Sequence, residues 1–430
     1  MGRALRCGEL NGAGKARARL TCFAAALLVC VGLSAWPALA QDTEEEDAGT
    51  EGPVTACARQ AEEDGEEPSP RAPRFNLGES CLAFGADVMF SNQRILGAGV
   101  NGLPILLSPS GRNISVPTTN TAQTYLRMDW RGFTAYGRLG LSTELNWVKA
   151  TGDDARYGVA QLTRLMGRFR DFRGGYGDSI TSFFAAPIEA NAFTPNRSVG
   201  LVSYDLKLSK ISALTAAIES GPVLGSLGTR FIPIALDQRP YFVGRWLQTY
   251  DRGEIHLAAA LTNRRLAPSR RDPTGRNVLG FAVTAGVRAQ VDVLGQQDEA
   301  SIQVTYADNA ISYLGPALDL GGVRSRVAQV ISARGVSATA AYTRNWRERW
   351  SSTVFGSTVD VISARGEADP RIASLRYGAN LVWKPATSVS IGAEVSRQRI
   401  RLNVAPSILR NSREVEAEAT IVTLTLQSSF

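Results

Sequence analysis

Histidine, cysteine and long apolar runs are scarce in this 430-residue sequence, and each scarcity excludes a class of protein. His256 is the only histidine, so a Ser–His nucleophile or a zinc site has almost no material to form from. Beyond the first forty residues, no apolar stretch reaches the length of about 20 residues that a membrane-spanning helix needs. We therefore expect no enzyme, no cofactor or metal site, and no helical membrane protein.

Residues 1–40 are typical of a signal peptide. Basic side chains come first, an apolar run at 23–36 follows, and Ala38-Leu39-Ala40 has the small-x-small pattern that signal peptidase cleaves. The alternative, a membrane anchor, needs a longer apolar run than this one. Gln41 follows the expected cut, and it cannot take a lipid as a cysteine would. The sequence thus predicts an exported chain whose mature form begins at Gln41.

Only two cysteines, Cys57 and Cys81, follow the signal peptide. In an exported chain, two cysteines without metal-ligand spacing most simply form one disulfide bond, and a metal site or reactive thiol is the alternative. Cys57 lies within residues 41–75, which hold eleven acids and three bases and almost no bulky apolar residue. Such a composition is typical of a mobile extension, because it cannot bury enough surface to offset chain ordering. We expect the disulfide bond to tie this extension to the folded part, residues 76–430.

Residues 76–430 carry a net charge of +11. No basic run is interleaved with aromatic residues, so binding of nucleic acid is not predicted. The excess charge is expected on solvated surface or against anionic lipid headgroups.

Apolar and polar side chains alternate in segments of about ten residues along this part of the chain. Clear examples are residues 124–131, 135–147, 157–170, 281–293 and 301–307. A period of two places one face of each strand in lipid and the other in a polar lumen. A soluble β-sandwich also alternates, but its inward faces must be apolar. The polar faces therefore favour an all-β, antiparallel transmembrane β-barrel.

Two further features agree with a barrel of the bacterial outer membrane. Short turns, such as 251–253, 294–297 and 384–386, alternate with long polar loops, as they do at the two ends of such barrels. The chain ends in an alternating strand whose last residue is Phe430. A C-terminal aromatic residue resembles the signal by which outer-membrane barrels are recognised for insertion.

Several stretches resemble, in the same order, strands and loops of the porin family of alphaproteobacteria. They are Cys57 with 79–85, then 183–184, 194–199, 280–288, 304–315, 354–357 and 383–395. The resemblance implies about 16 strands, a homotrimer embedded in outer-membrane lipid and lipopolysaccharide, and passive diffusion of small hydrophilic solutes and ions. The chain departs from the family between the cysteines, where it is acidic, and at Glu414, Glu416 and Glu418 before the final strand.

The resemblance also implies that the third loop, at about 174–199, folds into the barrel and narrows it. This loop carries Asp178 and Glu189. Alternation places six arginines on the polar faces of the neighbouring strands: Arg127, Arg131, Arg138, Arg164, Arg168 and Arg170. Arginines facing an acidic loop would set a transverse field that favours anions. The alternative is that they only pair with lumen carboxylates such as Asp129 and Glu144, and that the loop acids are merely solvated.

Other functions stay open on the sequence alone. An outer-membrane hydrolase would need a nucleophile and base within reach, whereas His256 alternates with Ile255 and Leu257 as an ordinary polar lumen residue would. A surface barrel that acts as an adhesin or structural anchor is compatible with the long polar loops at 97–120 and 263–279. A substrate-specific channel is a variant that the sequence does not rank against a general pore.

Overall fold

A computed structural model describes residues 74–77, 80–96, 118–151, 159–183, 198–220, 240–265, 277–293, 295–315, 333–363, 371–403 and 414–429. The expected signal peptide, most of the acidic extension, Cys57, Glu189 and Phe430 lie outside the described residues. No helix among the described residues is long and apolar enough to cross a membrane.

The described residues form seventeen strands and one short 3-10 helix, η3 (Ile311–Tyr313). The first nine strands are β1 (Arg74–Leu77), β2 (Ser80–Leu96), β3 (Thr118–Thr134), β4 (Gly137–Thr151), β5 (Val159–Phe169), β6 (Phe172–Asp178), β7 (Ser198–Lys207), β8 (Ser212–Ser220) and β9 (Tyr241–Tyr250). The others are β10 (Gly253–Arg265), β11 (Asn277–Val293), β12 (Gln296–Asp308), β13 (Ala333–Arg347), β14 (Trp350–Ser363), β15 (Arg371–Ala386), β16 (Val389–Asn403) and β17 (Glu414–Ser429).

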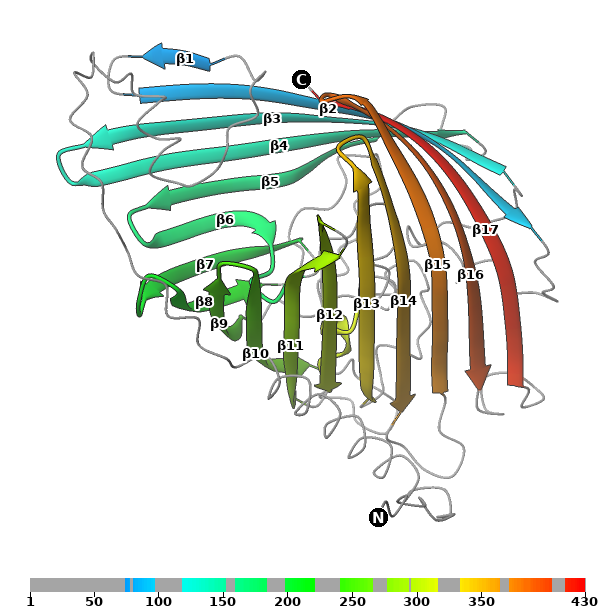
Figure 1. The fold of residues 1–430 in the computed structure, drawn as a ribbon. Coiled ribbons are helices and arrows are strands. Elements are labelled where there is room, and N and C mark those ends of the chain that lie inside the picture. The colour runs from blue at the N-terminus through cyan, green and yellow to red at the C-terminus, as the bar shows by residue number, and fades with distance from the viewer. Residues whose placement is uncertain are drawn as a thin grey trace, which may run out of the picture. The chain divides into compact units, whose positions relative to one another are not determined.

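Strands β2 to β17 form one closed antiparallel sheet of sixteen strands (Figure 1). Each strand pairs with its neighbours in chain order, and β17 closes the ring by pairing with β2 from Thr420↔Leu96 to Ser429↔Asp87. The four-residue strand β1 pairs with the start of β2. The predicted all-β barrel of about 16 strands is thereby confirmed, and closure leaves none of the strands β2 to β17 at the edge of the sheet.

The two ends of the barrel differ in their connections. At one end, turns of two to four residues join the strands, as at 135–136, 208–211 and 251–252. At the other end the connections are longer, as at 97–117 and 221–240. In outer-membrane barrels the short turns are periplasmic and the long loops extracellular. We call these ends the turn end and the loop end.

The two faces of each strand meet different surroundings, as the alternation predicted. On β14, Val354 is 55 % exposed on the outside of the ring, whereas its inward neighbour Thr353 is 1 % exposed. On β11, Phe281 and Val283 are exposed and Thr284 is buried. Large apolar side chains therefore cover the outside, and polar ones line the inside.

Several element boundaries differ from the prediction. Residues 135–136 form a turn rather than the start of a strand, and Gly137, with a φ of 130°, allows β4 to begin there. The turn expected at 384–386 lies at 387–388, because β15 continues to Ala386. The predicted third loop begins only after Asp178, because residues 172–178 pair with both β5 and β7 as β6.

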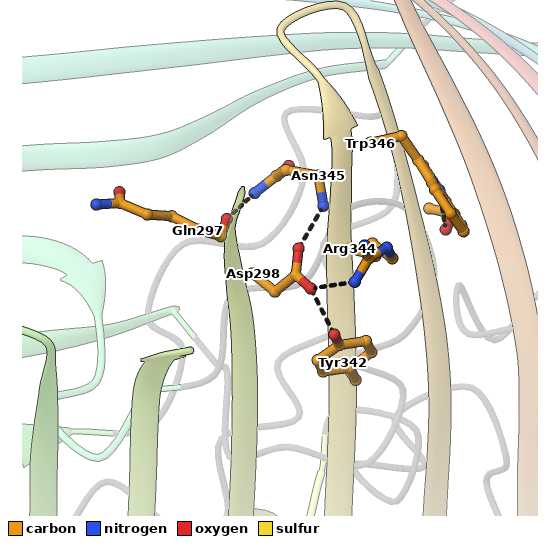
Figure 2. A network of polar contacts seen from close by, with 7 residues as sticks. Gln297, Asp298, Tyr342, Arg344, Asn345 and Trp346 are labelled. Carbon is orange, nitrogen blue, oxygen red and sulfur yellow. Dashed lines mark hydrogen bonds and ion pairs between the residues drawn. The ribbon is translucent and has the colours of Figure 1, made fainter. Parts of the chain in front are cut away.

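A polar network on the outer face joins β12 to β13 at the turn end (Figure 2). The Asp298 carboxylate accepts hydrogen bonds from Tyr342 Oη at 2.5 Å, Arg344 Nη1 at 2.9 Å and the Asn345 backbone N–H at 2.9 Å. The Arg344 guanidinium also lies 4.8 Å from the centroid of the Trp346 ring. Asp298 is fully buried by these partners, so a carboxylate is accommodated on an otherwise apolar face.

Candidate functional site

The inner wall of the barrel has an exposed part and a covered part. Arg127 and Arg164, on β3 and β5, are exposed inside the ring. In contrast, the inward side chains His256, Thr305 and Arg376, on β10, β12 and β15, are at most 1 % exposed. Among the described residues, the inward arginines that are exposed therefore lie on β3 to β5.

Five of the six predicted arginines lie on inward faces. Arg127 and Arg131 are on β3, Arg138 is on β4, and Arg164 and Arg168 are on β5, each alternating with outward side chains. Arg170 instead forms the turn after β5 with a φ of 53°, so it does not lie on the strand face where alternation placed it.

Arg127 lies between two carboxylates. Its Nη2 is 3.0 Å from Asp87 Oδ2, and its Nε donates a hydrogen bond to Glu144 Oε2 at 2.7 Å. Glu144 faces Arg164 on the next strand and accepts a hydrogen bond from Thr163 Oγ1 at 2.7 Å. Half of the Arg127 side chain is nevertheless exposed. Pairing with lumen carboxylates and lining the lumen are thus compatible at this residue.

Closer to the turn end, arginines meet across the strands. Arg168 pairs directly with Arg173 across β5 and β6, and Arg131 lies in the same row on the far side of Gly140. Like charges directly opposite one another are destabilising unless counter-charges offset them. Asp205 supplies one, at 2.6 Å from Arg173 Nη2. The prediction missed Arg173 because this residue lies between the strand expected at 157–170 and the third loop expected at about 174–199.

The exposed wall carries an excess of positive charge. The inward arginines of β3 to β6 number six: Arg127, Arg131, Arg138, Arg164, Arg168 and Arg173. The acids on or against this wall are Asp87, Asp129, Glu144, Asp178 at the last position of β6, and Asp205 on β7, which contacts Arg173. Six positive and five negative charges leave a net charge of +1 on this wall. Charged side chains that line a lumen set an electric field that acts on ions passing through it.

Two segments fold inward and cover the other wall. Residues 179–183 follow β6, and residues 309–315, which contain η3, follow β12. Ile180, Tyr313 and Leu314 pack in one buried cluster with inward apolar residues of β8 to β14. The start of the third loop therefore lies inside the ring, as the resemblance implied, and a second inward segment accompanies it.

Glu219 on β8 joins the two inward segments. Its fully buried carboxylate accepts hydrogen bonds from Ser179 Oγ at 2.9 Å, the Ile180 backbone N–H at 3.0 Å and Tyr313 Oη at 3.2 Å. Three donors from two segments stabilise a buried charge that would otherwise be costly. This role could not be predicted, because in the sequence Glu219 looks like any polar position of an alternating strand.

The described residues contain no group of three or more His, Cys, Asp or Glu side chains that could hold a metal ion. Cys81 opens β2 and is buried, and its expected partner, Cys57, lies outside the described residues. Their disulfide bond stays a prediction.

Several solved structures have a fold similar to that of this chain. The outer-membrane channel DcaP of Acinetobacter baumannii matches over 82 % of this chain and 97 % of its own, with a TM-score of 0.58 and 16 % identity. The fold is that of an outer-membrane channel. OprB of Pseudomonas putida (TM-score 0.49, 10 % identity, 81 % of this chain and 94 % of its own) is also similar. So is an anion-selective porin from Comamonas acidovorans (TM-score 0.47, 9 % identity, 82 % of this chain and all of its own). No family model and no curated protein matches the sequence.

Proposed function

We propose that this chain is a porin, a water-filled channel through which small hydrophilic solutes and ions diffuse passively across the outer membrane, with a preference for anions. One observation supports the anion preference: the inner wall along β3 to β6 holds six arginines against five carboxylates, with Arg168 and Arg173 directly opposed. A sixteen-strand ring is wide enough for an aqueous channel.

The finer assignments belong to the same proposal and rest on the sequence. They are membership of the porin family of alphaproteobacteria, a homotrimer in contact with lipid and lipopolysaccharide, cleavage of the signal peptide before Gln41, and the Cys57–Cys81 disulfide bond.

Recording from purified folded protein in a planar lipid bilayer tests the proposal. We expect stepwise ohmic conductance. In a potassium chloride gradient, the sign of the reversal potential should show that chloride permeates more readily than potassium. Absence of conductance in a correctly folded oligomer would contradict the channel and favour an adhesin or structural anchor. A reversal potential set by potassium would overturn the anion preference and leave the channel standing.

A further inference from the structure

Phe183, in the inward segment 179–183, packs against the wall formed by β10 and β11. It contacts His256, Gly286 and Arg288, and we call these three residues the seat. The ring of Phe183 lies over His256, with ring centroids 4.9 Å apart and planes inclined by 33°. His256 pairs across the strands with Gly286. A Cβ built on Gly286 would stand 2.4 Å from Phe183 Cδ1, which is closer than any real contact. The ring thus occupies space that only a glycine leaves.

Arg288 holds both the ring and the backbone of Phe183. Its guanidinium carbon lies 5.3 Å from the ring centroid, and its Nη2 donates a hydrogen bond to the Phe183 carbonyl at 3.2 Å. Glu254 on β10 orients this guanidinium from 2.8 Å, and Glu299 on β12 from 3.5 Å. A planar guanidinium makes these contacts together, which the point charge of a lysine cannot do.

The seat lies across the ring from the arginine wall. Strands β4 and β10 are six positions apart in a ring of sixteen, and β4 and β11 are seven apart. The segment is also fixed by Glu219 on β8 through Ser179 and Ile180. Both attachments draw residues 179–183 to the wall facing the arginines.

We propose that His256, Gly286 and Arg288 are positioning residues that hold Phe183, and with it segment 179–183, away from the arginine wall and so keep the passage along that wall open. The proposal rests on the channel function proposed above. Contacts at Phe183 restrict where the segment can lie, and releasing them lets it move into the space in front of Arg127 and Arg164.

Gly286→Ala tests the seat, with Gly356→Ala as the matched control. Both glycines lie in strands, but a Cβ on Gly356 meets nothing within 4 Å. We expect Gly286→Ala to lower the single-channel conductance and add brief closures, and Gly356→Ala to leave the recording unchanged. Arg288→Lys, which keeps the charge and loses the planar contacts, should show the same change more weakly. Unchanged recordings for both Gly286→Ala and Phe183→Ala would overturn the proposal.

The double variant Phe183→Ala with Gly286→Ala shows whether the effect passes through the ring. Residues that act on each other give non-additive effects, so the double variant should match Phe183→Ala alone. Effects that simply add would overturn the seat. If the unsubstituted protein carries no current, the channel proposal fails by itself. The seat is then judged by hydrogen exchange at residues 179–183, which should accelerate in Gly286→Ala and not in Gly356→Ala.

Discussion

Arg168 and Arg173 stand directly opposite each other across β5 and β6, both inside the barrel, and one carboxylate, Asp205, contacts the second of them. Substituting Arg168 removes a positive charge from the wall without taking a partner away from Asp205. We expect Arg168→Ser and Arg164→Ser each to shift the reversal potential in a salt gradient toward cations, because the wall loses its excess of positive charge. Arg397→Ser, on the outer face of β16, is the control and should leave the reversal potential unchanged. Equal shifts for inner and outer arginines would contradict the wall assignment.

The outward direction of alternate residues makes a second prediction. Leu145 lies outward at mid-strand on β4 and is 43 % exposed, whereas Ser142 on the same strand faces the lumen. An arginine facing lipid near the bilayer midplane costs about 2–4 kcal/mol in barrels of this type, and lumen positions tolerate charge. We expect Leu145→Arg to lower the free energy of unfolding of the barrel from lipid vesicles, measured by urea titration. Ser142→Arg should change this free energy little. A similar loss in both variants would refute the assignment of faces.

The outer network at Asp298 predicts a local contribution to stability. Asp298→Asn removes the negative charge that receives bonds from Tyr342 and Arg344, so the unfolding temperature of the barrel should fall. Asp292→Asn is the control, since its pair with Arg252 is largely exposed and such pairs contribute little. The temperature at which each variant changes from folded to unfolded mobility on a gel would measure its unfolding temperature. The idea is wrong if the two variants unfold at the same temperature.

The buried carboxylate of Glu219 predicts where the barrel interior loosens first. Glu219→Ala removes the carboxylate that accepts hydrogen bonds from Ser179 Oγ and Tyr313 Oη, and losing the partner of such a buried group costs about 1–3 kcal/mol. Hydrogen exchange should therefore accelerate in both inward segments, 179–183 and 309–315. Tyr313→Phe removes one of the bonds and should accelerate exchange mainly in the second segment. An effect of Glu219→Ala on one segment only would show that the carboxylate does not join them.

The ring could be predicted from the sequence because its strands have one face toward lipid and the other toward the lumen, and each environment selects a different kind of side chain. At 281–293 and 301–307, a period of two marks both faces directly, and the structure confirms their directions. Strand β6 was missed because its sequence, Phe-Arg-Gly-Gly-Tyr-Gly-Asp, is rich in glycine and lacks a regular apolar face. Its pairing with β5 and β7 comes from tertiary context.

The contacts of the inner wall could not be predicted because cross-strand register decides them. Gly286 meets His256, and Arg168 meets Arg173, only through the observed pairing. One feature of the sequence does indicate that part of the inner wall is covered. Leu201 and Val243 are apolar at inward positions, which an open polar lumen does not explain. Apolar residues on a lumen face indicate that another part of the chain covers them.

The meeting of β17 with β2 has a consequence for how the molecule is made. Ser429 pairs with Asp87, so residues 87–96 of β2 have no hydrogen-bonded neighbour on one side until β17, the last strand of the ring in chain order, has joined them. In lipid, each unpaired backbone group costs several kcal/mol, and an incomplete ring would present two such rows. Assembly must therefore proceed with the chain held outside the hydrocarbon, or with the edges of the incomplete sheet shielded, until all sixteen strands are available to join.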